Sequence, residues 1–546
     1  MLIVPILTIA GEPVGHEVAR ELAQSFILAK KSSTTRKKVR AVNIKTLLHD
    51  MGEASVPYYV FNVGQSEGFV IVSVDDDTDP ILAYSTTGEL DSETIPPQMR
   101  TWLQSYAEEI QKLRRQPTNC QQALEHQYAK PTMAISPLLQ TTWNQDSPYN
   151  NLCPELNGIH TVTGCVATAI AQVMKYHEWP PSIIKQIPAY YCGQLWEVND
   201  TTQRFHLDAI PAGTTLAWND MVNNYVDTES DEQKTAIAQL MKSIGTAVQM
   251  EYRRAQDGGS GAQPNKAVKA LQEYFGYSPT IRREYRNNFS LQAWQNMICE
   301  ELQAGRPVLY TGNSSQEGHA FVIDGYDGDG FFHINWGWGG RSNGYYRLSV
   351  AKPDEASGST KQDGYSSNQS CIIGIKPFEK GDKPVQYLTA TLDHVDGNAI
   401  YYSMICNRSD EGGLFNYGIG YYDEEEKLVI PIDTTRVSLR VLQNIPQKKF
   451  SVEINKLPDN STSRLFFISK TTESDKWIVS PKADIEYVNA KITEGGLTLT
   501  PNQMAPLLRV QTINFVGNKK TNIEQNIRVT IKNQGGEFYG QQGSRG

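Results

Sequence analysis

The spacing of hydrophobic and polar positions changes several times along the chain, and each change predicts a different kind of element. Apolar residues recur at helical spacing over residues 14–31, and three strand-like runs follow at residues 58–63, 68–74 and 81–85. An amphipathic helix is expected over residues 98–113. Residues 114–130 are polar and irregular, which is typical of a connector that a protease can reach. Together these patterns predict a compact α+β module before residue 131.

The pattern changes again beyond the charged break at residues 379–384, where short runs rich in Val, Ile, Tyr and Phe alternate with turns. Such runs are typical of an antiparallel, Ig-like β-sandwich, which we expect over residues 385–490. Two further strands are expected at residues 508–515 and 526–533, as part of a second β module over residues 505–546. Two strands cannot bury a core, so we expect either a truncated chain or strands that complete a neighbouring sheet.

Length and composition set broad limits on this picture. A chain of 546 residues suggests three or four domains, and 39 % hydrophobic with 20 % charged residues is typical of a globular protein. The net charge of −9 gives no general attraction to nucleic acid or anionic lipid. The basic cluster Lys30 to Arg40 is interpreted as a solvated linker rather than a binding patch.

The first ten residues, MLIVPILTIA, are apolar and end in small residues. They resemble the apolar part of a secretory signal, although the usual basic start is missing. We therefore interpret residues 1–11 as a signal segment whose start is truncated; the alternative is a buried N-terminal strand. No other run approaches the roughly 18 apolar residues of a membrane span.

Seven cysteines are present, without any paired CxxC spacing. A zinc site or a disulfide scaffold is therefore not expected. The odd number leaves at least one free thiol if the others pair, and Cys165 is the obvious candidate for it.

The segment around Cys165 has the composition of a helix start. Val162–Trp179 fits a helix that begins near Thr163, a plausible N-cap, and ends before Pro180. Cys165 would then lie in the first turn, where the helix dipole favours the thiolate that attacks a carbonyl. The alternative is a buried structural cysteine packed under a helix.

A second segment, 150 residues later, contains the matching base. Residues 319–323 and 331–335 are strand-like runs separated by turn residues, which predicts a hairpin. Centred on Asp327, this hairpin would place His319 opposite Asn335, as a base oriented by an amide. His333, opposite Phe321 in that register, is interpreted as structural. The alternative for His319 is an ordinary hydrogen-bonded histidine.

The aspartates at 324, 327 and 329 raise the possibility of calcium. Their spacing lacks the alternating ligands and closing glutamate of an EF-hand loop. No metal site is therefore expected.

The central segment resembles the streptopain family of secreted cysteine peptidases, within the papain-like superfamily. Matching motifs occur in the family's order over residues 131–378: NQDSPYN (144–150), TGCVATAIAQVMKY (163–176), GSGA (259–262), FGY (275–277), GHAFVIDG (318–325) and NWGWGG (335–340). The first module is similar to that family's propeptide, notably at residues 59–63 and 68–73. The sandwich region lies outside the resemblance.

The resemblance implies a papain-like α+β fold with Cys165 as nucleophile and His319 as base and then acid. Asn335 or Trp336 would orient the histidine, and Trp336 and Trp338 would flank it. Papain-like enzymes place an oxyanion-hole glutamine about six residues before the cysteine, but Ile159 stands at that position. The backbone N–H of Cys165 can still serve, while the side-chain donor stays unassigned.

The same resemblance implies that Ser260 and Gly318 line the substrate cleft, together with Trp338. The expected protein is a secreted or cell-surface cysteine endopeptidase made as a zymogen. Its propeptide (residues 12–130) would inhibit the catalytic domain (131–378) until it is cleaved near residues 128–131. Substrates would be proteins or peptides, with an apolar residue preferred two positions before the scissile bond, and no cofactor is implied.

A rival hypothesis belongs to another class of protein. The chain could be a surface adhesion or binding protein whose sandwich holds a cell surface or another chain, with the peptidase scaffold degenerate. The presence of both Cys165 and His319 argues against full degeneracy. Thiol reactivity separates the two, because an active Cys/His pair alkylates at mildly acidic pH.

Overall fold

The structure is a computed structural model. It describes residues 14–31, 39–41, 57–75, 78–92, 95–115, 133–193, 195–198, 201–313, 318–350, 369–409, 411–423, 428–458, 462–493, 496–502, 508–515 and 527–533. The expected signal segment at residues 1–11 and the expected processing site near residues 128–131 lie outside the described residues.

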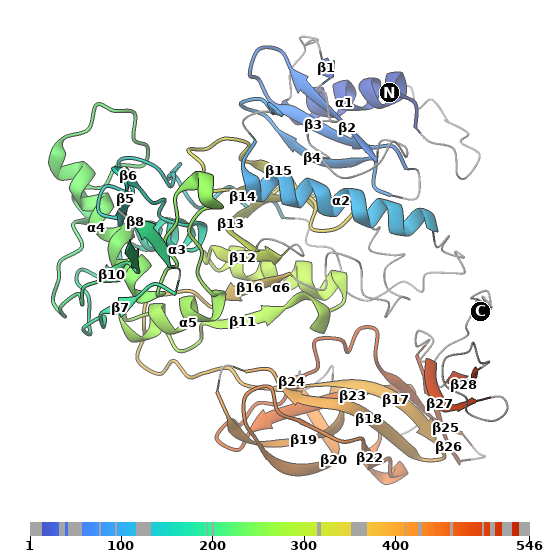
Figure 1. Cartoon of the computed structure of the whole chain (residues 1–546). Coiled ribbons are helices and arrows are strands. Elements are labelled where there is room, and N and C mark those ends of the chain that lie inside the picture. Colours follow the sequence, from blue (N-terminus) through green and yellow to red (C-terminus); the bar gives the residue numbers. More distant parts are fainter. Residues whose placement is uncertain are drawn as a thin grey trace.

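A ten-stranded sheet joins the N-terminal region to the central region (Figure 1). Its strand order is β1-β2-β3-β4-β15-β14-β13-β12-β16-β11. The N-terminal strands are β1 (Val39–Ala41), β2 (Tyr58–Val63), β3 (Phe69–Ser73) and β4 (Ile81–Ser85). The central strands are β11 (Arg282–Tyr285), β12 (Val308–Asn313), β13 (Gly318–Tyr326), β14 (Phe332–Asn335), β15 (Gly344–Tyr346) and β16 (Ser370–Ile373). Antiparallel pairing of Tyr84 with Tyr345 and of Ala83 with Tyr346 connects the two sets.

Helices of both regions cover this sheet. α1 (His16–Lys31) packs its buried Ala19, Ala23 and Ile27 on the N-terminal strands. α2 (Pro97–Arg115) and α6 (Leu291–Gln303) share one apolar core with the central strands. The N-terminal predictions of helix, three strands and helix are thus confirmed, with boundaries within two residues of those expected.

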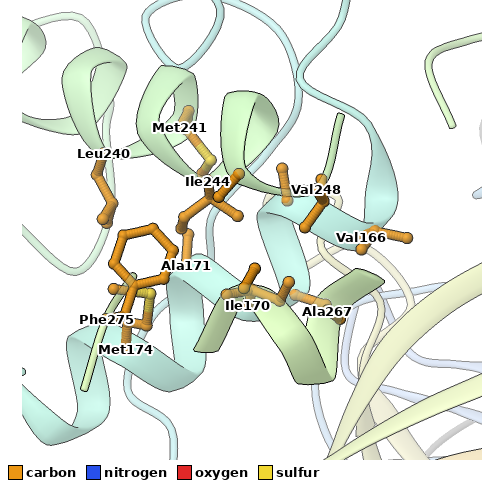
Figure 2. Packing of buried hydrophobic residues seen from close by; sticks show 14 of the residues in the cluster. Val166, Ile170, Ala171, Met174, Leu240, Met241, Ile244, Val248, Ala267 and Phe275 are labelled. Atoms are coloured by element: carbon orange, nitrogen blue, oxygen red, sulfur yellow. The ribbon is translucent and has the colours of Figure 1, made fainter. Parts of the chain in front are cut away.

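A second core lies between the helices of the central region (Figure 2). α3 (Cys165–His177) is buried along most of its length and packs against α4 (Asp231–Ala247), α5 (Pro264–Glu273) and strand β13. Ser230 starts α4 with a capping box, in which its side chain accepts from the Gln233 N–H. Short hairpins surround these helices: β5 (Glu155–Leu156) with β6 (Ile159–His160), β7 (Tyr190–Tyr191) with β10 (His206–Leu207), and β8 (Trp196–Val198) with β9 (Thr201–Gln203).

The C-terminal region is rich in strands, as the alternating pattern predicted. One sheet has the order β17-β18-β21, with β22 also paired to β18; the other has the order β20-β19-β23-β25-β26, with β24 paired to β23. The strands are β17 (Leu388–Asp396), β18 (Ala399–Asn407), β19 (Gly413–Asp423), β20 (Leu428–Leu439), β21 (Asn444–Ile445), β22 (Lys448–Ser451), β23 (Thr462–Thr471), β24 (Ile478–Val479), β25 (Val488–Thr493) and β26 (Gly496–Pro501). A single apolar core lies between the two sheets.

The last two described strands, β27 (Leu508–Phe515) and β28 (Ile527–Asn533), pair with each other. Both runs were expected as strands. Their assignment to a second module stays a prediction. Over the described ranges, we find no helix that combines the length and the apolar character needed to cross a bilayer.

Candidate active site

Cys165 is the first residue of α3, and a glycine precedes it for a steric reason. Gly164 is the N-cap residue, at a φ of 87°. A Cβ at this position would lie 2.7 Å from Met250 Sδ and 3.0 Å from the carbonyl oxygen of Ser260. The expectation that Thr163 is the N-cap was wrong, because its hydroxyl is hydrogen-bonded to Thr168 (2.9 Å) instead.

Cys165 is 8 % exposed as a residue, and two effects act on its thiol in opposite directions. Burial raises the pKa of the Cys165 thiol above its ordinary value, since a thiolate loses its hydration there. The backbone N–H groups of Ala320, Val166 and Cys165 itself point at the sulfur and lower that pKa, but burial dominates. The contact with Ala320 brings the thiol beside the residue that follows His319.

His319 is the second residue of β13, and its side chain is partly buried. The predicted hairpin between β13 and β14 forms, but its register was wrong. Asn335 pairs with Val322, and His333 pairs with Gly325 across a bulge between Ile323 and Gly325. His319 instead pairs with Gly312 on β12. The turn is centred on Asp329 rather than on Asp327, so the partner of His333 moves by four positions. The bulge reduces this shift by one, so the partner of Asn335 moves by three.

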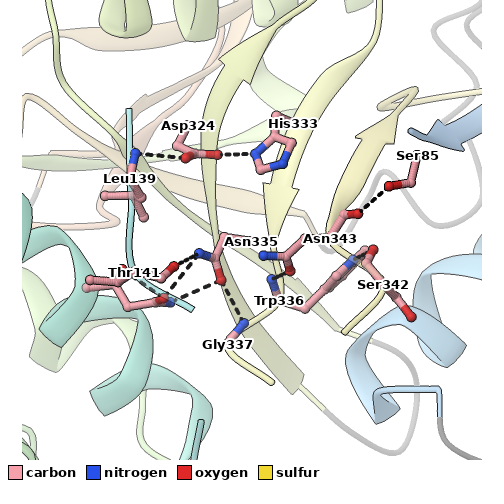
Figure 3. A network of polar contacts seen from close by, with 11 residues as sticks. Ser85, Leu139, Thr141, Asp324, His333, Asn335, Trp336, Gly337, Ser342 and Asn343 are labelled. Atoms are coloured by element: carbon pink, nitrogen blue, oxygen red, sulfur yellow. Dashed lines mark hydrogen bonds and ion pairs between the residues drawn. The ribbon is translucent and has the colours of Figure 1, made fainter. Parts of the chain in front are cut away.

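Asn335 is 2 % exposed and lies in a network of polar contacts (Figure 3). Its Nδ2 donates to the Thr141 carbonyl (2.8 Å) and to Gln172 Oε1 (3.1 Å). Its Oδ1 accepts from the Gly337 N–H (3.1 Å) and from Gln172 Nε2 (3.3 Å). Since Gln172 belongs to α3, Asn335 joins the cysteine helix to the end of β14.

Trp336 packs in the core on the other face of the sheet. Its ring centroid is 4.8 Å from that of Phe321 and 6.3 Å from that of Trp102 on α2. Its Nε1 donates to the Ser342 carbonyl (3.0 Å). Trp338 is partly buried beside the same core. The N-terminal region therefore contacts Trp336, which was expected to flank His319.

Ser260 and Gly318 occupy different positions relative to Cys165. Ser260 is 8 % exposed. Its hydroxyl donates to the Val162 carbonyl (2.6 Å) and accepts from the Arg253 N–H (2.9 Å). Its side chain thus holds together the loop that leads into α3. Gly318 is the first residue of β13, directly before His319.

Gln145 is a candidate oxyanion donor that the sequence pattern did not indicate, because it lies 20 residues before Cys165 rather than about six. Its residue is 4 % exposed, and its Nε2 has no hydrogen-bond partner within the described ranges. Its carbonyl accepts from the Thr163 N–H (3.2 Å), which places the loop two residues before Cys165. A buried, unpaired amide normally costs free energy, so such a group often serves a reaction. The matched motif at residues 144–150 contained this signal.

His333, which was interpreted as structural, lies beside a buried carboxylate and not opposite Phe321. Its Nδ1 lies 2.6 Å from Oδ1 of Asp324, a carboxylate that is fully buried (Figure 3). The other oxygen of Asp324 accepts from the Leu139 N–H (3.0 Å).

The six described cysteines, Cys153, Cys165, Cys192, Cys299, Cys371 and Cys406, are free thiols.

The turn between β13 and β14 contacts the N-terminal region. Lys30 Nζ lies 2.7 Å from carboxylate oxygens of both Asp327 and Asp329, and the Tyr84 hydroxyl donates to Asp327 (2.8 Å). Lys30, the first residue of the basic cluster, is therefore an interface residue rather than part of a solvated linker. The two aspartates of the rejected calcium loop serve as its partners.

Helix α2 makes the second set of contacts between the two regions. Trp102 is 2 % exposed and packs edge-on against Phe321, with ring centroids 5.7 Å apart. Glu109 accepts from the Val350 N–H (3.1 Å) and from the Ser349 hydroxyl. The N-terminal region is thus held on the strand that contains His319 and on the segment after β15.

Comparison with known proteins assigns these two parts. The family model described as "Peptidase C10 family" matches residues 143–346, and the one described as "Spi protease inhibitor" matches residues 11–110. Streptopain of Streptococcus pyogenes is 35% identical over 336 residues, which are 58% of this chain and 80% of streptopain. The thiol protease/hemagglutinin PrtT of Porphyromonas gingivalis is 32% identical over 390 residues, which are 69% of this chain and 43% of PrtT.

The structural comparison agrees. The solved structure of a Prevotella intermedia prointerpain A fragment covers 63% of this chain and 100% of the fragment, with 28% identity and a TM-score of 0.50. The chain belongs to the peptidase C10 family, the streptopain family of cysteine peptidases. An inhibitor-like N-terminal region precedes the peptidase part, as in a protease precursor, and a strand-rich region follows. The chain spans less than half of the length of PrtT.

Proposed function

We propose that the chain is the zymogen of a secreted cysteine endopeptidase that hydrolyses protein substrates through Cys165 and His319. One observation carries this proposal: a cysteine at the start of a buried helix has its sulfur beside the backbone N–H that follows the histidine. The helix start and a neighbouring imidazolium would together stabilise the thiolate once the site opens.

The reaction follows from these positions. His319 takes the proton of the Cys165 thiol, and the sulfur attacks the peptide carbonyl. The oxyanion that forms would accept hydrogen bonds from the Cys165 N–H and from Gln145 Nε2. His319 then gives its proton to the leaving amine, which leaves an acyl-enzyme. A water molecule, deprotonated by His319, attacks the thioester and releases the acid and the free thiol.

The other site residues act through position. Asn335 would hold α3 and β14 together, while Trp336 and Trp338 would keep water from the ion pair. Ser260, Gly318 and Trp338 would line the cleft.

We propose domain limits of 12–130 for the propeptide, 131–378 for the catalytic domain, 385–490 for the sandwich and 505–546 for a partial second module. Secretion rests on the apolar residues 1–11.

Inhibition by the N-terminal region is supported by its contacts. Trp102 packs against Phe321 on the strand of His319, and strand β4 extends the catalytic sheet. Removal of this region would free β13, and Trp336 and Trp338 after β14, to take the working arrangement. Cleavage is placed near residues 128–131.

Intact mass followed over time, in reductant at pH 6–7, tests this function. The wild type should lose about 130 residues from its N-terminus, as the proposed boundary implies, whereas Cys165→Ala and His319→Ala should stay whole. If the wild type also stays whole and shows no peptidase activity after processing by an added protease, the chain is not a peptidase. Loss of the region from all three proteins would show that another protease does the processing.

A further inference from the structure

The strand-rich C-terminal region contacts the peptidase region at the sheet edge farthest from the propeptide. In the strand order, β11 ends the sheet at one side and the N-terminal strands end it at the other. Figure 1 shows the N-terminal region and the sandwich on opposite sides of the central region. Exposed sheet edges favour unwanted pairing, and proteins commonly cover them with another part of the chain.

A buried carboxylate on β11 connects the two regions. Glu284 is 4 % exposed, and its Oε1 accepts from Arg282 Nε (2.6 Å) on the same strand. Its Oε2 accepts from the hydroxyl of Tyr387 (2.5 Å), which directly precedes β17 of the sandwich. Because a buried carboxylate needs a donor at each oxygen, the peptidase region depends on the sandwich for the second one.

Tyr387 is fixed to the sandwich rather than to a loose linker. Its backbone N–H donates to the Ser409 hydroxyl (3.3 Å). The next N–H, of Leu388, donates to the buried Ser469 hydroxyl on β23 (2.8 Å). Both sheets of the sandwich thus contribute to the position of the tyrosine that reaches Glu284.

A second contact lies at the start of α6. Ser290 is the N-cap of this helix and accepts from the Ala293 N–H (3.0 Å). Its hydroxyl donates to Asp484, which lies between β24 and β25 of the sandwich. The same serine therefore closes a helix of the peptidase region and binds the C-terminal region.

The connection between the two regions is also structured, although its charges suggested a break. Lys376 Nζ binds Glu379 (2.6 Å) and Asp382 (2.8 Å), and the Glu379 N–H donates to Asp382 (2.9 Å). Its beginning is tied to the peptidase region, since the Phe378 N–H donates to the Gly276 carbonyl (3.2 Å). The connection is therefore a hydrogen-bonded turn, which restricts rotation of the sandwich relative to the peptidase region.

We infer that the β-sandwich is a fixed part of the peptidase body, docked on the β11 edge and the start of α6 through Tyr387–Glu284 and Asp484–Ser290. It stays attached when the propeptide leaves from the other end of the sheet. In the mature enzyme, the orientation of the sandwich relative to the substrate cleft is then constant. The two regions unfold as one cooperative unit.

Calorimetry of the full-length Cys165→Ala protein, which cannot process itself, tests this inference. Tyr387→Phe removes one hydroxyl and should lower Tm by a few degrees, because Glu284 stays buried without its donor. Adding Asp484→Asn should separate the transition into two. Tyr422→Phe is the matched control, since Tyr422 is 42% exposed on β19 and should leave Tm unchanged.

Hydrogen exchange provides a second measurement on the same proteins. The amides of residues 282–285 and 387–388 should be protected together in the Cys165→Ala protein and should lose protection together in Tyr387→Phe. The inference is wrong if the Cys165→Ala protein itself melts in two transitions. It is also wrong if Tyr387→Phe behaves like Tyr422→Phe in both measurements. Neither readout depends on peptidase activity, so the proposed function can fail while this inference stands.

Discussion

At the scale of single residues, burial decides the protonation of the Cys165 thiol, the proposed nucleophile. Three backbone N–H groups favour its anion, but burial outweighs them and raises the thiol pKa. A raised thiol pKa means less thiolate at neutral pH, and only the thiolate attacks carbonyls or alkylating reagents. The precursor therefore needs an opening of the site, rather than a new residue, to become reactive.

The pH dependence of alkylation follows from this pKa shift. In the precursor, the rate at Cys165 should rise with pH around a midpoint above the ordinary value of about 8.5. After processing, the proposed ion pair with His319 should move the midpoint to the acid side. Iodoacetamide labelling read by peptide mass spectrometry measures both. Equal labelling of precursor and mature enzyme at pH 6 would contradict it; buried Cys371 is the internal control.

Gln145 is the second residue with a testable role. Gln145→Ala should lower kcat of the processed enzyme by about 100- to 1,000-fold and change KM little, as for other oxyanion donors. Gln145→Glu, which keeps the size but loses the amide donor, should be as slow. Steady-state kinetics on a peptide substrate decides this. An unchanged kcat in Gln145→Ala would show that Gln145 does not stabilise the oxyanion.

At the scale of elements, the end of α1 connects to the β13–β14 turn through charge. Burial alone lowers the pKa of Lys30, but its hydrogen bonds and charges with Asp327 and Asp329 raise it overall. A lysine with a raised pKa gives its full contribution below its unfolded pKa of about 10.4, and that contribution is lost only as pH rises beyond it. The contact is thus intact across the physiological range.

Lys30→Met should loosen the propeptide and speed self-processing. The two hydrogen bonds from Lys30 to carboxylates stabilise by about 1–2 kcal/mol. This corresponds to a roughly 5- to 30-fold faster appearance of the mature mass. Lys31→Met is the matched control, because Lys31 contacts Glu67 of its own N-terminal region. Equal processing rates for the two variants would show that the contact with Asp327 does not restrain the propeptide.

At the scale of the whole molecule, one sheet runs from the propeptide through the peptidase to the edge covered by the sandwich. Loss of the N-terminal strands turns β15 into an edge and uncovers Phe321 and Trp336, against which Trp102 packs. The processed enzyme should therefore melt several degrees below the Cys165→Ala precursor, since burial of one aromatic side chain alone contributes about 3 kcal/mol or more. Thermal unfolding of the iodoacetamide-blocked mature form measures this, and an equal Tm would contradict it.

The sequence by itself determined the local elements and singled out Cys165 and His319 as the proposed reacting pair. Periodicity predicted α1, β2 to β4 and α2, because each buries one regular face and its spacing is visible in the chain. The composition around Cys165 and His319 marked a helix start and a strand, since these depend on neighbours in sequence. The alternation of short apolar runs predicted the C-terminal strands for the same reason.

Only the tertiary structure decided features that depend on distant partners. The hairpin register was set by a turn centred two residues later than expected. The N-cap is Gly164 rather than Thr163, at a position where Met250 leaves no space for a side chain. That the side-chain amide of Gln145 has no hydrogen-bond partner among the described residues is known only from the tertiary structure. The partners of Lys30 and Glu284 lie about 300 and 100 residues away along the chain, respectively. No local sequence pattern predicts these partners, because long-range contacts form only when separate elements pack together.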